Sequence, residues 1–173
     1  MPTLNDLVMM QTKFGELIAN TNGDLPKVGS TAPPFVLTGN DLKDISSAQF
    51  PGKNLVLNIF PSIDTSTCAT SVREFNKRAA QLNNTVVLCV AKDLPFAMRR
   101  FCGAEGIENV ITASDFKGNG FAEDYGVLFL DGRFQGLCSR DIVIIGPDGK
   151  IKYTEHVPLI GQEPDYEAAL AVL

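Results

Sequence analysis

Residues 54–72 read NLVLNIFPSIDTSTCATSV, a stretch that joins a predicted strand to a predicted helix through a short polar loop. Its first part, 54–60, is a short run of branched and aromatic side chains that ends at Pro61, which is typical of a buried strand. Beyond the loop, apolar residues recur at helical spacing; this set is Val72, Phe75, Ala79 and Leu82. A buried strand that leads directly into an amphipathic helix indicates an α/β fold.

Cys68 is the residue of this stretch that points to chemistry. It lies four residues before Val72, which places it on the inward stripe of the helix, in the first turn. Unpaired backbone N–H groups and the positive end of the helix dipole meet there, and both favour a thiolate over a thiol. The competing interpretation is a small buried hydrophobe that happens to be cysteine, and position alone does not decide between the two.

The other three cysteines, Cys89, Cys102 and Cys138, form no C-x-x-C pair with one another or with Cys68. This spacing excludes the redox pair of a thioredoxin and the knuckle of a zinc site. Cys89 lies inside the apolar segment 85–91, a predicted strand, where a structural role is favoured.

Cys102 is a second candidate for chemistry. The pattern predicts a helix that begins at Asp93 as N-cap and stops at Gly103, with a buried stripe of Leu94, Met98 and Phe101. Cys102 then lies at the edge of this stripe in the last turn. Because last turns fray easily, this thiol can leave its place at modest cost. A half-buried filler is the alternative.

Length and composition limit the frame for this chemistry. The chain has 173 residues with 45% hydrophobic content, which suits one good core, so we expect a single domain over 1–173 in which 1–24 form an N-terminal extension and hairpin. The net charge is −5 and the basic residues are dispersed, which provides no basic stripe for nucleic acid. The sequence has no signal-peptide pattern and no run of about 18 apolar residues, so we expect a cytoplasmic protein with no membrane association. Free cysteines in a reducing compartment indicate chemistry more often than disulfide stapling.

Strands and helices alternate along the chain after a weakly patterned hairpin at 9–20. The expected strands cover 35–37, 42–45, 54–60, 85–91, 109–112, 141–145 and 151–155. Further helices are expected at 121–125 and from about Pro164, the last with an inward face of Tyr166, Ala169, Leu170 and Leu173. The residues at 146–149, GPDG, fit the turn of a hairpin. This order predicts a thioredoxin-like α/β fold with a central mixed sheet flanked by helices and a short N-terminal hairpin.

Four residues are candidates to support a thiolate at position 68. The Thr65 hydroxyl, three residues earlier, can donate to the sulfur or orient a substrate oxygen, and Pro61 has a fixed φ that shapes and shields the loop. Arg140 precedes the strand 141–145, which we expect to lie centrally in the sheet, so its guanidinium could hold a thiolate or a peroxide oxygen; an arginine that faces solvent is the alternative. The only histidine, His156, is expected to be a surface or satisfied residue at the end of the last strand.

Several segments resemble the thiol peroxidase (Tpx) branch of the peroxiredoxins. The pattern P-x-x-x-T-x-x-C at 61–68, followed by SVR, is similar to the peroxidatic loop. The segment RFCGAEG at 100–106, with NVIT at 109–112, is similar to the resolving-cysteine segment of that branch, and the ending EPDYEAAL at 163–170 is similar too. The resemblance extends from about Leu25 to the C-terminus. The first eight residues and the extra thiol Cys138 depart from it.

The resemblance implies a thioredoxin-dependent peroxidase that serves antioxidant defence, with Cys68 as the peroxidatic and Cys102 as the resolving cysteine. It assigns the supporting shell to Pro61, Thr65 and Arg140. The thiolate would attack a hydroperoxide, and the sulfenic acid would condense with Cys102 to a disulfide within one chain, with no metal or organic cofactor. Thioredoxin as the reductant, a homodimer, and a preference for alkyl hydroperoxides over hydrogen peroxide are also implied. Cys138 is a rival resolver, because it lies two residues before Arg140 and could be near the same pocket.

Two alternatives come from other functional classes. One is a thiol hydrolase or transferase in which His156 is the base for Cys68. The other is a binding module with a thioredoxin-like fold, in which Cys68 is inert filler. Labelling with a thiol reagent at pH 6 separates these alternatives from the peroxidase. Slow, uniform labelling of all four cysteines would indicate the binding module, and fast labelling without peroxide consumption would indicate the hydrolase.

Overall fold

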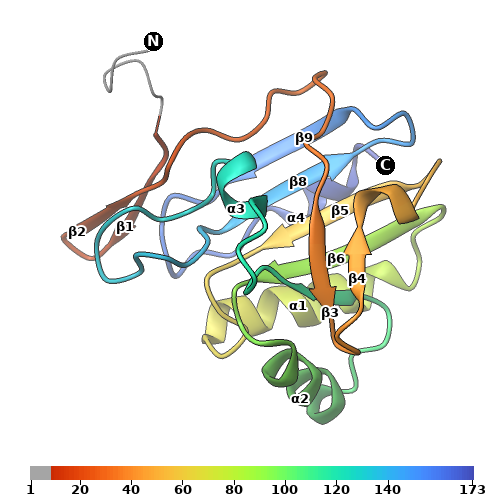
Figure 1. The fold of residues 1–173 in the computed structure, drawn as a ribbon, viewed down its shortest axis with the longest axis horizontal. Coiled ribbons are helices and arrows are strands. Elements are labelled where there is room, and N and C mark those ends of the chain that lie inside the picture. Colours follow the sequence, from red (N-terminus) through yellow and green to blue (C-terminus); the bar gives the residue numbers. More distant parts are fainter. Residues whose placement is uncertain (1–8) are drawn as a thin grey trace.

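A seven-stranded mixed sheet forms the centre of the protein (Figure 1). The computed structural model describes residues 9–173. The first eight residues, which depart from the family resemblance, lie outside the described part. The sheet order is β4-β3-β7-β6-β5-β8-β9, and the pairs β5–β6 and β6–β7 are parallel while the other pairs are antiparallel. The strands are β3 Val36–Gly39, β4 Asp44–Ser46, β5 Asn54–Ile59, β6 Thr85–Ala91, β7 Ile111–Ser114, β8 Asp141–Ile145 and β9 Ile151–His156.

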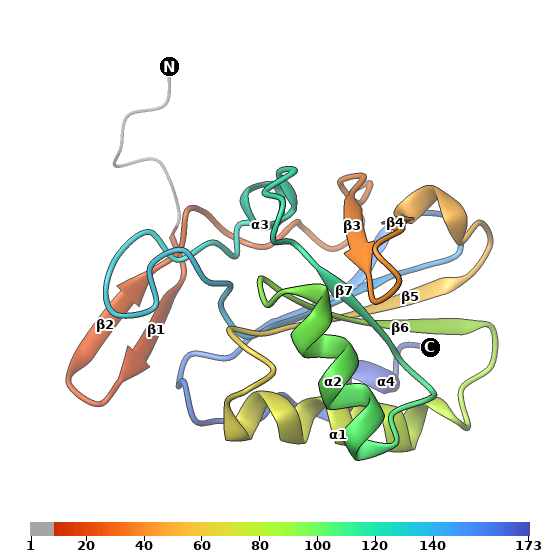
Figure 2. The ribbon, with the colours of Figure 1, turned by 60° about the horizontal axis from the view of Figure 1, so that its bottom comes forward.

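Helices cover both faces of the sheet (Figure 2). They are α1 Ser66–Ala79, α2 Pro95–Glu105, α3 Phe121–Asp124 and α4 Tyr166–Leu170, with a 3₁₀ turn η1 at Ser47–Gln49. Alternate residues of β5 enter two separate apolar clusters: Val56 packs with side chains of α1, α2 and α4, whereas Leu57 packs with side chains of α3. Because successive strand residues point to opposite faces, the two clusters lie on the two sides of the sheet. The expected thioredoxin-like fold is confirmed.

The N-terminal hairpin is confirmed as well. Strand β1, Gln11–Phe14, pairs antiparallel with β2, Leu17–Asn20, and Gly15 in the turn has a φ of 59°, which suits glycine. The hairpin projects from the sheet and is held by the chain that follows β9: the Lys13 amide donates to the Pro158 carbonyl over 2.7 Å, and the Ile160 amide donates to the Lys13 carbonyl over 3.0 Å. The hairpin is therefore joined to the segment 157–161.

The expected boundaries of the second helix were wrong. Helix α2 passes through Gly103 and ends at Glu105, and the C-cap Gly106 has a φ of 65°, which lets the following Ile107 amide donate to the Cys102 carbonyl over 3.0 Å. At the other end Leu94 is the N-cap and is 52% exposed, so it does not belong to the buried stripe, whereas Met98 and Phe101 are buried as expected. Cys102 still lies in the last turn.

Three smaller expectations also need correction. The strand expected at 109–112 is β7 at Ile111–Ser114, because the loop after α2 is longer than expected. Strand β8 is not central but second from the edge, next to β9. Leu173 is 37% exposed, because helix α4 ends at Leu170 and the inward face stops there.

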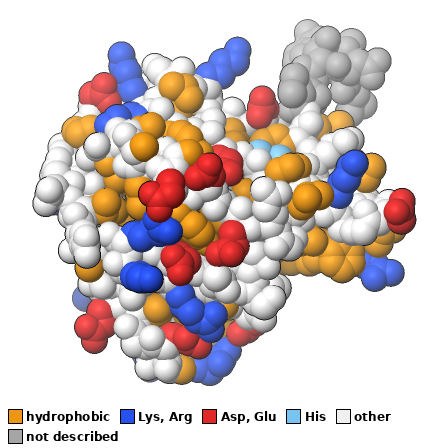
Figure 3. Space-filling view, turned by 180° about the vertical axis from the view of Figure 1, so that it is seen from behind, with side chains coloured by type: hydrophobic (Ala, Val, Ile, Leu, Met, Phe, Trp, Pro, Cys, Tyr) orange, Lys and Arg blue, Asp and Glu red, His pale blue; other side chains and the backbone are white. Residues whose placement is uncertain are grey.

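The described surface has a mixed character. On the face seen in Figure 3, basic and acidic side chains are interspersed, and apolar side chains gather on the projecting end of the molecule. Three of the exposed apolar residues belong to the hairpin: Phe14, Leu17 and Ile18. Within residues 9–173, we find no helix with the length and apolar character needed to cross a membrane.

Candidate active site

Cys68 lies in the first turn of α1 and has no exposed surface. Its sulfur is 3.4 Å from Nη1 of Arg140, which donates to it. Arg140 therefore places a buried, positively charged donor directly on the sulfur. The inward position of Cys68, expected from its spacing to Val72, is confirmed.

Arg140 is 1% exposed, so the solvent-facing alternative for this residue is wrong. Its Nη2 donates to the Ile160 carbonyl over 2.9 Å, and its own carbonyl accepts from the Val157 amide over 3.0 Å. Its Nε is buried and has no hydrogen-bond partner within residues 9–173. The guanidinium is thus held by its bonds to the Cys68 sulfur and the Ile160 carbonyl, and Nε can donate to a further group.

The loop between β5 and α1 is held by the Asp93 carboxylate, so the prediction that Asp93 caps helix α2 is wrong. Asp93 accepts from the Ser62 hydroxyl over 2.7 Å and from the Ile63 amide over 2.8 Å. The N-cap of α1 is Thr65, but its hydroxyl donates to the Ser62 carbonyl over 3.0 Å and makes no hydrogen bond to the sulfur. The loop is therefore tied down by Asp93, while the Thr65 side chain braces the loop in this state.

A small hollow of about 190 Å³ opens above Arg140. It brings together three of the expected site residues, Pro61, Thr65 and Arg140, with Phe14 from the hairpin and Phe134 from a distant loop. Since Arg140 lines the hollow and also contacts the sulfur, Cys68 lies directly behind the wall. Sequence reasoning missed the two phenylalanines, because they are separated by more than a hundred residues and have no local pattern that pairs them.

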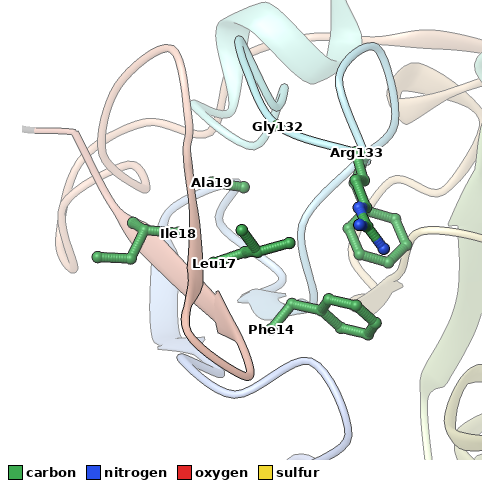
Figure 4. Close-up of a pocket in the computed structure, with 7 residues that line it drawn as sticks. Phe14, Leu17, Ile18, Ala19, Gly132 and Arg133 are labelled. Carbon is green, nitrogen blue, oxygen red and sulfur yellow. The ribbon is translucent and has the colours of Figure 1, made fainter.

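An apolar hollow of about 250 Å³ adjoins the first and shares Phe14 and Phe134 with it. Leu17 and Phe14 point from the hairpin toward the loop that carries Arg133 (Figure 4). The two phenylalanine rings meet edge to face, with centroids 5.5 Å apart. Together the two hollows extend from Thr65 and Arg140, beside the thiol, to the apolar side chains of the hairpin.

Cys102 is half-buried and packs at the edge of the same apolar cluster as Cys68. Its sulfur lies 3.8 Å from the Thr112 hydroxyl, and it lines a surface hollow of about 490 Å³. Two exposed ion pairs fasten α2 to the α1 side: Arg73 with Glu105 at 2.8 Å, and Arg100 with Asp64 at 3.0 Å. Exposed ion pairs add little to stability, so α2 is only lightly held at these points.

The remaining two thiols are fully buried. Burial raises the pKa of Cys89 to about 12, and burial also raises the pKa of Cys138. Cys138 packs in the cluster that contains Leu57, on the opposite side of the sheet from Cys68, so the expectation that it lies near the same pocket is wrong. All four cysteines are free thiols in this structure.

His156 is satisfied by hydrogen bonds, as expected, and it does not contact Cys68. Nδ1 of the ring is 2.7 Å from the Asp141 carboxylate and Nε2 is 2.9 Å from the Gln11 carbonyl. With both nitrogens engaged, the imidazole is not placed to act as a base for the thiol.

Comparison with known proteins agrees with this fold. The family model described as Redoxin matches residues 27–170, so the chain belongs to the Redoxin family. A thiol peroxidase of Mycobacterium tuberculosis is 64% identical over 154 residues, which cover 89% of this chain and 92% of that protein. One of Corynebacterium glutamicum is 50% identical over 165 residues, which cover 95% of this chain and 99% of that protein. A solved structure of a peroxiredoxin-like protein from Aquifex aeolicus aligns with a TM-score of 0.88 at 35% identity, over 95% of this chain and 96% of that one. Within the Redoxin family, these relatives place the chain in the thiol peroxidase branch of the peroxiredoxins, a class of oxidoreductases.

Proposed function

We propose that this protein reduces hydroperoxides by nucleophilic attack of the Cys68 thiolate on the terminal peroxide oxygen. The O–O bond breaks, the sulfur keeps one oxygen as a sulfenic acid, and the other oxygen leaves as water or an alcohol. The observation that carries the proposal is the buried guanidinium of Arg140, 3.4 Å from the Cys68 sulfur, at the wall of a hollow open to small molecules. Because the sulfur has no exposed surface, a peroxide reaches it after a small local opening of this wall.

Arg140 has two roles in this scheme. It stabilises the thiolate before attack, and its unused Nε donor supports a contact with the peroxide oxygens as charge develops on them. Thr65 is assigned a second donor role, which requires its hydroxyl to turn from the Ser62 carbonyl toward the substrate. Pro61 lines the hollow, where its ring excludes water and its missing N–H leaves no competing donor.

Replacement of Arg140 by alanine should slow the reaction of the reduced protein with hydrogen peroxide by about 10- to 1000-fold, as expected for a donor that acts on developing charge. The rate is measured in a single turnover, from the loss of free Cys68 thiol in quenched samples. Arg99→Ala removes an exposed arginine on α2 and should leave the rate unchanged. Arg140→Lys should restore only part of it, since an ammonium lacks the forked geometry of the guanidinium. An unchanged rate in Arg140→Ala would refute the role of this residue.

We further propose that Cys102 completes the cycle. Its thiol condenses with the Cys68 sulfenic acid, which forms a disulfide and releases water. A disulfide requires Cα atoms within about 7 Å, so the first turn of α1 and the last turn of α2 must rearrange. The half-buried position of Cys102 and the exposed ion pairs that hold α2 support such a local unwinding. Thioredoxin then reduces the disulfide, which returns both thiols.

The apolar hollow under the hairpin supports a preference for alkyl hydroperoxides. Its lining is mainly apolar, and it continues from the hollow above Arg140 through Phe14 and Phe134. An organic tail placed there would leave the peroxide group next to the thiol, whereas hydrogen peroxide has no tail to bind.

Leu17→Ser should raise the KM for cumene hydroperoxide about fivefold, because the loss of one apolar contact with a bound tail is worth about 1 kcal/mol. The KM for hydrogen peroxide should not change, since Leu17 lines the apolar hollow under the hairpin and not the hollow above Arg140. Val28→Ser, at another exposed apolar side chain away from both hollows, is the matched control. Equal changes in KM for both peroxides would contradict the proposal that the apolar hollow under the hairpin binds the organic tail.

The family resemblance extends the proposal to a homodimer, and the sequence features described above extend it to a location in the cytoplasm and to a single domain over 1–173. The two alternatives find less support. The hydrolase needs a base near the thiol, and His156 is bonded elsewhere. The inert binding module leaves the buried contact between Arg140 and Cys68 without a purpose.

A further inference from the structure

His156 and Asp141 form a buried pair beside the active site. They are cross-strand partners of β8 and β9, and Asp141 directly follows Arg140. The Asp141 side chain is fully buried and also accepts from the Ser139 hydroxyl, whereas the His156 side chain is 16% exposed. The other ring nitrogen, Nε2, reaches strand β1 of the hairpin at the Gln11 carbonyl, with the Thr12 hydroxyl 3.4 Å away.

The two contacts of the ring need one more proton than a neutral histidine carries. A backbone carbonyl only accepts, so Nε2 must hold a proton to bond to Gln11. Nδ1 then faces a carboxylate, and that contact is a hydrogen bond only if either the imidazole or Asp141 is protonated as well. The contact to β1 and the contact to Asp141 are therefore both made only while the pair retains this extra proton.

Hydrogen bonds of the segment 157–161 connect the pair of His156 and Asp141 to Arg140. The segment 157–161 begins directly after His156. It is hydrogen-bonded to Lys13 of the hairpin, and its Ile160 carbonyl accepts from Arg140. The hairpin in turn places Phe14 in the wall of the hollow above Arg140. Loss of the His156 contact to β1 would loosen the hairpin and the carbonyl that orients the guanidinium.

We propose that His156 is a positioning residue: its protonated pair with Asp141 fastens the hairpin and the segment 157–161, and so holds Arg140 on the Cys68 sulfur. This inference rests on the proposed function, because it assigns to Arg140 the role given above. It makes peroxide reduction sensitive to pH through a group that does not touch the substrate.

The charged groups around His156 fix the direction of this pH dependence. Burial lowers the pKa of His156, but the hydrogen bond and charge of Asp141, the hydrogen bond to the Gln11 carbonyl and the charge of Asp24 together outweigh burial, so the net pKa is raised. Burial raises the pKa of Asp141, which is opposed by His156, Ser139 and Arg140. An unfolded histidine has a pKa of about 6.5, so the stabilising contribution is complete below that pH and is lost as pH rises through the raised folded value.

The test compares wild type with His156→Gln, a neutral side chain whose single amide cannot place donors as the two ring nitrogens do. The rate of the reduced protein with hydrogen peroxide should fall about tenfold at pH 6, short of the 100-fold that a 1 Å misplacement can cost. The ratio of wild-type to variant rate should fall toward one as the pH rises through the raised pKa of His156, because wild type then also loses the proton. Iodoacetamide alkylation of Cys68 across the same pH range corrects for the thiolate fraction in each protein. Lys152→Gln removes an exposed charge from the same strand and should keep the wild-type profile.

Hydrogen exchange gives a readout that does not depend on catalysis. The Lys13 and Ile160 amides should exchange faster in His156→Gln than in wild type at pH 6, with the central strands unchanged. Asp141→Asn offers an amide N–H that can donate to Nδ1 of a neutral ring while Nε2 donates to Gln11, so this variant should keep the wild-type rate and exchange at pH 6 but lose the pH dependence. If both variants match wild type in rate, profile and exchange while Arg140→Ala is slow, the positioning role is refuted and the proposed function stands. If Arg140→Ala is also unaffected, the proposed function itself fails.

Discussion

Cys68→Ser is expected to abolish peroxide reduction, a loss of at least about 10,000-fold in kcat, as found when a catalytic nucleophile is removed. A serine hydroxyl is not ionised near neutral pH, so Arg140 would face an alcohol in place of a thiolate, and no nucleophile would remain. The fold should persist, because the substitution is nearly isosteric. The measurement is hydroperoxide consumption in an assay coupled to thioredoxin and thioredoxin reductase.

Cys138→Ala provides the matched control for this experiment. Its thiol is equally buried but lies in the other apolar cluster, so peroxide consumption should stay within a few fold of wild type. Activity of Cys68→Ser at a level close to wild type would remove Cys68 from the mechanism and return it to the role of a buried filler.

Cys102→Ser is expected to stop turnover after one reaction. The variant should consume about one equivalent of peroxide at the wild-type rate and then remain as a Cys68 sulfenic acid, because no thiol within the chain can condense with it. Steady-state activity with thioredoxin should fall by a factor of 100 or more, roughly the loss expected when a step made by one positioned group is removed. Rapid-mixing kinetics measure the amplitude of the first turnover and the steady-state rate that follows it.

Peptide mapping of oxidised wild-type protein tests the same step from the product side. One equivalent of peroxide, followed by alkylation under non-reducing conditions, should yield a Cys68–Cys102 disulfide. Cys138 is disfavoured as the resolver, because it lies on the opposite side of the sheet and its thiol pKa is raised by burial. Recovery of a Cys68–Cys138 disulfide with free Cys102 would overturn the assignment.

The strand, loop and helix around Cys68 could be predicted because they depend on local pattern. The apolar run of β5, the proline and the helical spacing after it each have one favoured conformation. The end of α2 could not be predicted in the same way. Either Gly103 or Gly106 could end the helix, and only the backbone shows that Gly106 is the one with positive φ. Asp93 was equally ambiguous, since a carboxylate after a strand can cap a helix or hold a loop.

The parts of the site that sequence reasoning missed are contacts between distant segments. Phe14 and Phe134 meet only because the hairpin folds back beside the loop before β8. The pairing of Asp141 with His156 depends on a register shift between Ile144 and Ile145 in the β8–β9 hairpin. Counting outward from the turn without that shift would pair Asp141 with Glu155, so the histidine could be seen only as satisfied, without its partner.

The claim that the Cys68 thiolate is the group that reacts with peroxide is tested most directly by trapping the oxidised sulfur. Reduced Cys102→Ser protein is mixed with one equivalent of hydrogen peroxide in the presence of dimedone, and the adduct is located by mass spectrometry of the digested peptides. The account predicts a dimedone adduct on Cys68, where the Arg140 guanidinium donates to the sulfur, with Cys89 and Cys138 unmodified because burial raises the pKa of both of these thiols. An adduct on either of those residues, or unreacted peroxide with no adduct on Cys68, would contradict it.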